Sequence, residues 1–103
     1  MIIPKQFKLF GSTIKVIYDQ KRFIDNTESM GFASYRENTI TLNPVLLNDN
    51  TEIAEQTFLH EVVHFILYFA GPAFTKTDNH MHKDEDFVDL VASILHQILT
   101  TQE

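Results

Sequence analysis

The sequence predicts a small α+β protein in which two β-hairpins form an antiparallel sheet of about four strands, packed with two helices. Short stretches of alternating apolar and polar residues, separated by turn residues, occupy the first part of the chain, and two longer stretches without strand alternation follow residue 50. With 103 residues, 44% of them hydrophobic and nine of them Phe, the chain can build one core. We therefore expect residues 1–103 to form a single domain.

The first hairpin is predicted at residues 7–18. Residues 7–10 and 14–18 alternate apolar with other side chains, and they flank a turn at residues 11–13 that contains Gly11. The polar stretch that follows, residues 19–30, shows no sustained period, so we expect a connection with one short helical turn.

A second hairpin is predicted from residues 31–35 and 39–43, joined by a turn at residues 36–38. In its second strand, Ile40 and Leu42 point to one side of the sheet because side chains alternate along a strand. Pro44 closes this strand. The apolar face of the sheet must then be covered by the helices that follow.

The first helix is predicted to begin among residues 48–51, all of them suited to an N-cap, with Asp49 and Glu52 spaced as a capping box. Nothing breaks a helix until Gly71, and Pro72 disfavours its continuation. The face expected to pack on the sheet carries Leu59, Val62, Ile66 and Phe69.

The second helix is predicted at residues 84–100, with acidic side chains in the first turn, where the helix dipole favours them. Its apolar side chains recur at helical spacing, which predicts a packed stripe of Phe87, Leu90, Val91, Ile94 and Ile98. The loop between the helices, residues 73–83, is long for so small a domain, and loops of this kind are often functional.

Composition excludes several function classes. The formal net charge is −6 and the basic residues are scattered, so we expect no nucleic-acid partner. The chain start lacks a signal sequence and the longest apolar run, residues 65–71, is too short to span a bilayer, so we expect a cytoplasmic protein without a membrane role. Without cysteine, only His, Glu and Asp remain as strong zinc ligands.

The first helix contains the candidate metal-binding and catalytic residues, in the pattern H-E-x-x-H at residues 60–64. His60 and His64 are one turn apart on one face, so both imidazoles can bind one Zn²⁺ ion. Glu61 is offset by about 100° around the helix, so it can take a proton from a water on the metal without being a ligand. The alternative is a core helix whose polar groups merely pair, but three ionisable groups in one apolar turn would be costly to bury for that purpose alone.

A catalytic zinc site needs a third protein ligand. Glu85 and Asp89 are four residues apart on the second helix, so they share a face that can turn toward the first. At this point the chain resembles the gluzincin peptidases, in which H-E-x-x-H is followed by a ligand Glu on the next helix and an Asp one turn later. The resemblance implies that Glu85 is the third ligand and that Asp89 hydrogen-bonds a ligand histidine.

Other readings of these residues remain open. Glu85 could be one of several acidic groups that match the helix dipole. His80 and His82, in the loop between the helices, compete for the third position, because a third histidine is the ligand in other H-E-x-x-H classes such as SprT-like proteins. Tyr35, Tyr68 and the same two loop histidines are candidates to stabilise an oxyanion.

The whole layout resembles small phage-type proteins related to the ImmA/IrrE group, which implies a minimal zincin-like fold. We therefore predict a zinc-dependent metallopeptidase whose substrate is a peptide or protein, with a repressor-like protein as the target that the resemblance implies. Residues 39–43, if they form an exposed sheet edge, would hold substrate backbone by strand addition. The alternative is a zinc-stabilised binding or regulatory module of phage or mobile-element origin that has no turnover.

Overall fold

The computed structural model describes residues 1–47, 50–74 and 84–101, apart from the side chains of residues 71–74. The predicted α+β class is confirmed, since four strands, a short 3₁₀ helix and two long helices follow one another along the chain. In order these are β1 (Gln6–Leu9), β2 (Ser12–Tyr18), η1 (Gln20–Phe23), β3 (Gly31–Ser34), β4 (Thr39–Leu42), α1 (Thr51–Phe74) and α3 (Glu85–Thr100).

Both predicted hairpins form, but the first turn lies earlier than expected. Strand β1 pairs with β2 and β3 pairs with β4, in both cases antiparallel. The β1–β2 turn consists of Phe10 and Gly11, both with positive φ, which is the backbone of a two-residue hairpin turn of type I′. Ser12 and Thr13, expected in the turn, belong to β2.

The sheet is mixed, so the expectation of a purely antiparallel sheet is wrong at one pair. The strand order is β1-β2-β4-β3, and β2 and β4 run parallel, with Val16 opposite Ile40. Residues 19–30, which contain η1, join β2 to β3, and β3 returns the chain so that β4 enters beside β2 in the same direction. Strand β4 is therefore central and β3 lies at the edge, which contradicts the proposed role of residues 39–43 as an exposed edge.

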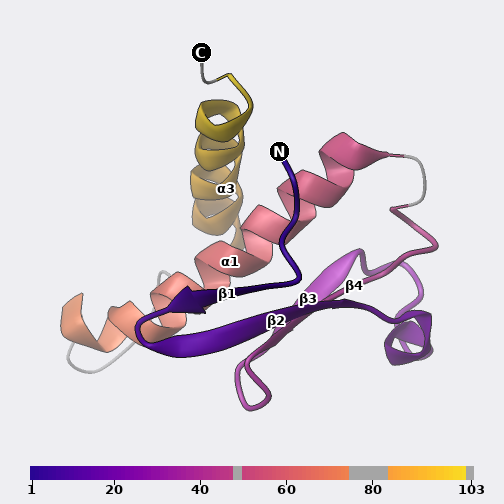
Figure 1. Cartoon of the computed structure of the whole chain (residues 1–103), viewed down its shortest axis with the longest axis horizontal. Helices are drawn as coiled ribbons and strands as arrows, with labels where there is room; N and C mark the ends of the chain where they lie inside the picture. The colour runs from indigo at the N-terminus through magenta and orange to yellow at the C-terminus, as the bar shows by residue number, and fades with distance from the viewer. Residues whose placement is uncertain (48–49, 75–83, 102–103) are drawn as a thin grey trace.

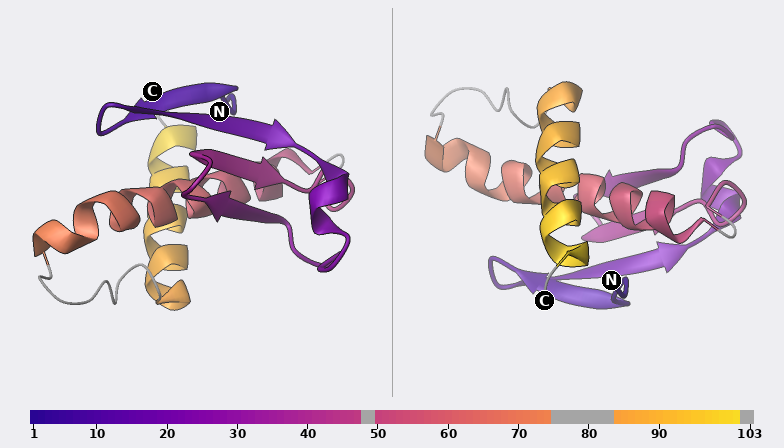
Figure 2. Two further views of the ribbon diagram at one scale, coloured as in Figure 1. Left: turned by 90° about the horizontal axis from the view of Figure 1, so that it is seen from below. Right: turned by 90° about the horizontal axis from the view of Figure 1, so that it is seen from above.

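Helix α1 lies between the sheet and α3. Figure 1 shows α1 running behind the sheet with α3 crossing it steeply, and the two views of Figure 2 show the sheet on one side of α1 and α3 on the other. In both views of Figure 2 the N-terminal end of α3 lies toward the β3 edge and its C-terminal end toward β1. The first turn of α3 is thus on the side of α1 that faces the edge strand.

The main core lies between the sheet and α1 and continues to α3. It consists of Ile14, Val16, Ile40, Leu42, Leu47, Phe58, Leu59, Val63, Phe65, Val88 and Ala92. Of the four side chains predicted to face the sheet from α1, only Leu59 is fully buried, while Val62 and Phe69 pack partly against this core. Because α1 has apolar contacts on two sides, its buried residues do not follow a single stripe.

The ends of α1 were predicted with mixed success. Asn50 caps the helix, since its Oδ1 accepts a hydrogen bond from the backbone N–H of Ile53 at 3.0 Å. The capping box assigned to Asp49 lies outside the described residues. The helix runs to Phe74, past Gly71 and Pro72, so the predicted end is wrong. A proline disfavours helix and removes one backbone donor, but it is not an absolute stop.

Helix α3 begins where it was predicted, because Asp84 accepts a hydrogen bond from the N–H of Phe87 at 3.1 Å as N-cap. The predicted stripe is half wrong: Leu90, Ile94 and Ile98 are exposed, whereas the buried residues are Val88, Ala92 and His96. The helix is apolar over a wide arc, and the half that packs on α1 is the half beside Glu85 and Asp89.

Among the described residues, no helix has the length and hydropathy needed to cross a bilayer.

Candidate metal centre

His60 and His64 lie together on α1, as the i, i+4 spacing predicts. Their Nε2 atoms are 3.2 Å apart, and their ring centroids are 4.8 Å apart. His64 is buried, and the side chain of His60 is about one fifth exposed. Both imidazoles therefore direct a ring nitrogen at one point on the surface of the helix.

Glu85 reaches the same point from the first turn of α3. Its Oε2 lies 2.9 Å from His60 Nε2 and its Oε1 lies 3.0 Å from His64 Nε2. The Glu85 side chain is 62% exposed, so solvent reaches the cluster from this side. The three residues form a group whose donor atoms all lie within 4.8 Å of one another, and they could hold a metal ion.

Asp89 lies one turn further along α3 and contacts the other nitrogen of His60. The distance from His60 Nδ1 to Asp89 Oδ1 is 2.6 Å. Because a carboxylate only accepts, the imidazole N–H at Nδ1 donates to Asp89, and neutral His60 then has a lone pair at Nε2. The hydrogen bond thus sets the tautomer that a metal ligand requires.

The donor set fits a zinc ion. In a tetrahedral site with Zn–N bonds of roughly 2.0–2.1 Å, neighbouring ligand atoms lie roughly 3.3 Å apart, close to the 2.9–3.2 Å observed among these atoms. The lone pair of His60 Nε2 and the Glu85 carboxylate are both acceptors at hydrogen-bond distance. They repel each other unless a proton or a metal ion lies between them, so the cluster is built for a cation.

Glu61 is buried directly beside this cluster, with 7% of its surface exposed. Burial raises the pKa of its carboxyl from 4.5 to about 7; the charge of His60 lowers it, and the carboxylates of Glu85 and Asp89 raise it. A carboxyl with a pKa near neutrality can both accept and return a proton at the same pH. A buried carboxyl with this pKa could act as a general base.

Tyr35 and Tyr68 stand on the C-terminal side of the cluster along α1. Their rings stack with centroids 4.2 Å apart and an angle of 3° between the planes, and Tyr35 also meets the edge of Phe65 at 5.1 Å. Burial, and then the negative charges of Glu61 and Glu85, raise the pKa of the Tyr35 hydroxyl well above its usual value of 10. Tyr35 therefore remains a hydrogen-bond donor at any pH at which the protein works.

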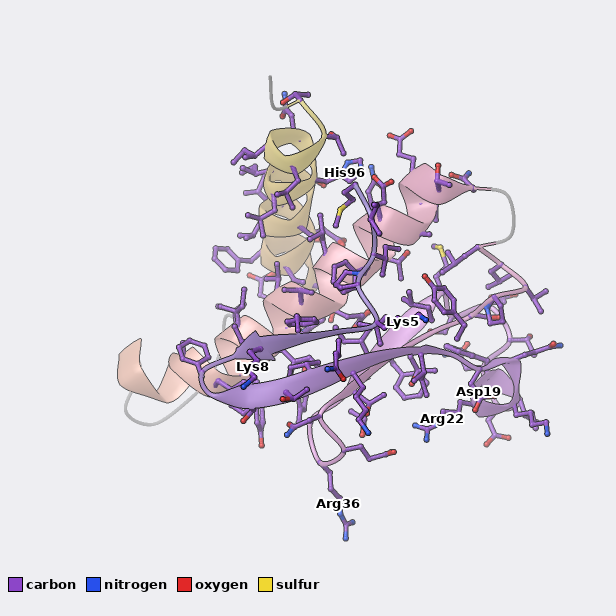
Figure 3. All side chains as sticks on the ribbon, viewed as in Figure 1. Lys5, Lys8, Asp19, Arg22, Arg36 and His96 are labelled. Carbon is purple, nitrogen blue, oxygen red and sulfur yellow. The ribbon has the colours of Figure 1, made fainter. Side chains whose placement is uncertain are left out.

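The remaining histidines divide into two groups. His80 and His82, the competing third ligands, lie outside the described residues. His96 is far along α3 from the cluster, and Figure 3 shows it on the side of α3 that faces the N-terminal half of α1. There its Nε2 lies 3.0 Å from Glu55 Oε1. This pair, which sequence reasoning did not foresee, joins the two helices away from the candidate site.

A groove beside the cluster was also missed. It has a volume of about 490 Å³, and it opens along the N-terminal half of α1 next to the start of β3. Its lining residues are Met30, Gly31, Ile53, Gln56, Thr57, His60, Glu61 and Asp89. The helical spacing of Ile53, Thr57 and His60 signals a common face, but only the tertiary structure places Met30 and Gly31 opposite them.

Comparison with known proteins agrees with this geometry. No curated protein and no solved structure matches the chain. The model of the SprT-like family matches residues 5–102. This range covers all four strands and both helices, including the H-E-x-x-H motif and the two acidic residues of α3. The chain belongs to the SprT-like family.

Proposed function

We propose that the protein is a zinc-dependent metallopeptidase that hydrolyses peptide bonds. The observation that carries this proposal is the convergence of His60, His64 and Glu85 on one point beside the buried carboxyl of Glu61. A purely structural zinc site has no use for a fourth, non-ligating carboxyl buried beside it. Membership in the SprT-like family, which is metallopeptidase-like, supports the same reaction class.

In this proposal each residue has a separate task. His60, His64 and Glu85 would hold the zinc ion, and Asp89 would keep the imidazole of His60 oriented through the 2.6 Å contact. Zinc lowers the pKa of water toward neutrality and polarises a carbonyl. Glu61 would take the proton of the attacking water and return it to the leaving amine. Tyr35, close enough to Glu61 and Glu85 for their charges to raise the pKa of its hydroxyl, is favoured over Tyr68 as the donor to the oxyanion.

The third zinc ligand is the one position of the proposed site for which the chain offers alternative residues. Glu85 gives the gluzincin arrangement, and its two contacts with the histidines support it. Family membership brings back the alternative of a third histidine, for which His80 and His82 are the candidates. Zinc content of Glu85→Ala and of the double variant His80→Ala/His82→Ala separates them. We expect zinc to be lost in the first and kept in the second, and the reverse result would reassign the ligand.

The substrate is proposed to be an extended peptide segment held along β3. This strand is paired only with β4 among the described strands, so its other side can pair with added backbone. Gly31, at its start, approaches Thr57, and Tyr35, just after its end, contacts Phe65 and Tyr68. Strand β3 therefore runs beside α1 in the same direction, past the metal centre. A peptide paired with it would cross the ligands.

The biological target stays a prediction that comes from resemblance alone. The likeness to small phage-type proteins of the ImmA/IrrE group implies cleavage of a repressor-like protein in the cytoplasm. We retain this as the proposed setting, with no nucleic-acid and no membrane partner.

A zinc-stabilised regulatory module without turnover is the second candidate. It is favoured by one observation: the cluster joins α1 to the first turn of α3, so a metal ion there would bind the two helices together. Such a module needs the three ligands but makes no use of Glu61.

Glu61→Gln separates the two candidates. Under the peptidase proposal, the purified variant keeps one zinc per chain and loses hydrolysis of an unfolded protein by at least about a hundredfold, because the general base is gone. Glu52→Gln, an exposed carboxylate on the same helix, serves as the matched control and should behave as wild type. Equal and undetectable hydrolysis by zinc-loaded wild type and Glu61→Gln would favour the module.

A further inference from the structure

We propose that the groove lined by Met30, Gly31, Ile53, Gln56 and Thr57 selects substrates by accepting an apolar side chain next to the scissile bond. The inference rests on the proposed peptidase function and names the side-chain class that this function would recognise. The groove shares His60, Glu61 and Asp89 with the candidate metal centre, so whatever occupies it lies beside the reacting bond.

Two large apolar side chains, from two different elements, line the groove. Met30, just before β3, is 44% exposed, and Ile53, on the first turn of α1, is 37% exposed. Both are large apolar side chains that remain open to solvent. An occupant that covered them would gain hydrophobic burial. The Met30 side chain can also adapt to the shape of an occupant, because it has three rotatable bonds and a polarisable sulfur.

The floor of the groove is closed by a close approach of β3 to α1. A Cβ atom at Gly31 would lie 2.9 Å from Thr57 Cγ2 and 3.1 Å from Leu42 Cδ2, so the strand and the helix are in contact there. The Thr57 hydroxyl faces Met30 Sδ at 3.9 Å. The groove is therefore closed at this contact between β3 and α1.

Charge in the groove is confined to one end. Among the described residues, its lining contains neither Lys nor Arg, and the ionisable groups there, His60, Glu61 and Asp89, all belong to the candidate metal centre. Of the other described lining residues, Gln56 and Thr57 offer polar side chains, and both are neutral. An acidic side chain would meet Glu61 and Asp89 without a basic partner. A neutral apolar side chain such as Leu, Met or Phe fits this environment, and a volume of about 490 Å³ accommodates it with the adjoining backbone.

The first test maps cleavage sites. Zinc-loaded wild type digests an unfolded protein, and the products are sequenced by mass spectrometry. We expect Leu, Met and Phe together to be enriched at least about fivefold at one position beside the cleaved bond. Met30→Lys and Ile53→Lys, at the two large apolar lining residues, should each reduce this enrichment and admit Asp and Glu. Ile24→Lys, at an apolar residue that is 75% exposed and outside the groove, should leave it unchanged.

The second test measures binding without turnover. Zinc-loaded Glu61→Gln is titrated with fluorescent eight-residue peptides of Gly and Ser that carry Leu, Asn or Glu at one central position. Leu and Asn have similar shapes, so their comparison isolates polarity. We expect the Leu peptide to bind about tenfold more tightly than either of the others, a ratio typical of burying one apolar side chain. Met30→Lys in the same background should remove the difference.

The two tests separate failure of the groove from failure of the peptidase proposal. If wild type cleaves without side-chain preference and the three peptides bind equally, the groove assignment is overturned while the peptidase stands. If wild type cleaves nothing but the Leu peptide is still preferred and Met30→Lys abolishes the preference, the groove stands and the peptidase proposal fails. If Ile24→Lys changed either readout as much as Met30→Lys does, the assignment of the groove would also be overturned.

Discussion

Glu61 is a residue whose acid–base chemistry depends strongly on the fold. Its neighbours in sequence make it part of H-E-x-x-H, but the pKa near 7 arises from burial and from two carboxylates on another helix. The raised pKa means that the folded protein binds a proton at Glu61 more tightly than the unfolded chain does. Metal-free protein therefore loses stability as the pH rises from about 4.5 to about 7 through this group.

This linkage predicts a stabilising effect of Glu61→Gln in metal-free protein at neutral and higher pH. At pH 4 both proteins carry a neutral group at this position, so their free energies of unfolding should be similar. By pH 8 wild type should be less stable than the variant by about 3 kcal/mol, because a shift of one pKa unit corresponds to about 1.4 kcal/mol. Urea unfolding at both pH values in the presence of a chelator measures the difference. A gap that does not grow with pH would contradict the assignment.

Glu85 and Asp89 differ in what they contact, and their variants should differ accordingly. Glu85→Ala removes one of three ligands and should abolish stable zinc binding at neutral pH. Asp89→Ala removes only the hydrogen bond to His60 and should weaken zinc binding by about 10 to 100-fold. Asp89→Asn, which keeps the shape but loses the charge, should fall between wild type and Asp89→Ala.

Competition of a chelator against each variant gives the order of zinc affinities. Complete loss of zinc in Asp89→Ala together with retention in Glu85→Ala would reverse the two roles. Asp86→Ala, an exposed acidic residue in the same first turn of α3, controls for the loss of one negative charge.

At the scale of elements, helix α3 both carries Glu85 and Asp89 and packs apolar side chains against α1. Glu85 and Asp89 must face α1, so the apolar surface that packs is the half beside them, with Val88 and Ala92 at its centre. The other half, including Ile94, stays exposed. The rotation of α3 thus brings Glu85 and Asp89 to His60 and leaves large apolar side chains exposed.

Strand β4 offers an independent test of the core. The hydroxyl of Thr41 is fully buried, and among the described residues it has no hydrogen-bond partner. Thr41→Val removes this unpaired group at nearly constant shape and should raise the free energy of unfolding by about 1 kcal/mol. Thr39 is the matched control on the same strand: its hydroxyl donates to the carbonyl of Glu37 at 3.0 Å, so Thr39→Val should lower stability. Urea unfolding of both variants distinguishes these signs.

At the scale of the whole molecule, the candidate metal centre joins α1 to α3, because His60 and His64 lie on α1 and Glu85 lies on α3. Without a cation, the lone pair of His60 Nε2 lies against the Glu85 carboxylate at this junction. A bound zinc ion would convert that repulsion into three bonds that join the helices. Binding and stability are then linked, because the unfolded chain has no preformed site.

Zinc should consequently raise the melting temperature of the whole domain. At a free concentration one hundred times the Kd, the stabilisation is about 2.7 kcal/mol, which corresponds to roughly 10 °C or more for a domain of this size. The effect should shrink at pH 5, since the imidazoles must lose their protons to bind metal. Calorimetry with zinc, and then with excess chelator, measures it. His64→Ala should show no zinc-dependent shift, and a shift of wild-type size in that variant would place the metal elsewhere.

The parts of the fold that the sequence predicted are those set by local patterns. Alternation and turn residues located both hairpins, N-cap chemistry located the start of α3, and the i, i+4 spacing placed His60 beside His64. The patterns failed where competing contacts decide, as at the end of α1, where the helix continues past Gly71 and Pro72.

The sequence by itself determined the motif, the residue types of the candidate ligands and the α+β class, because these depend on spacing within single elements. Only the tertiary structure decided which strand is the edge, since a parallel β2–β4 pair depends on the path of a long connection. It alone also decided that Glu85 meets both histidines and that Met30 and Ile53 line one groove. Periodicity on one helix cannot specify the rotation of another, because that rotation follows from packing between them.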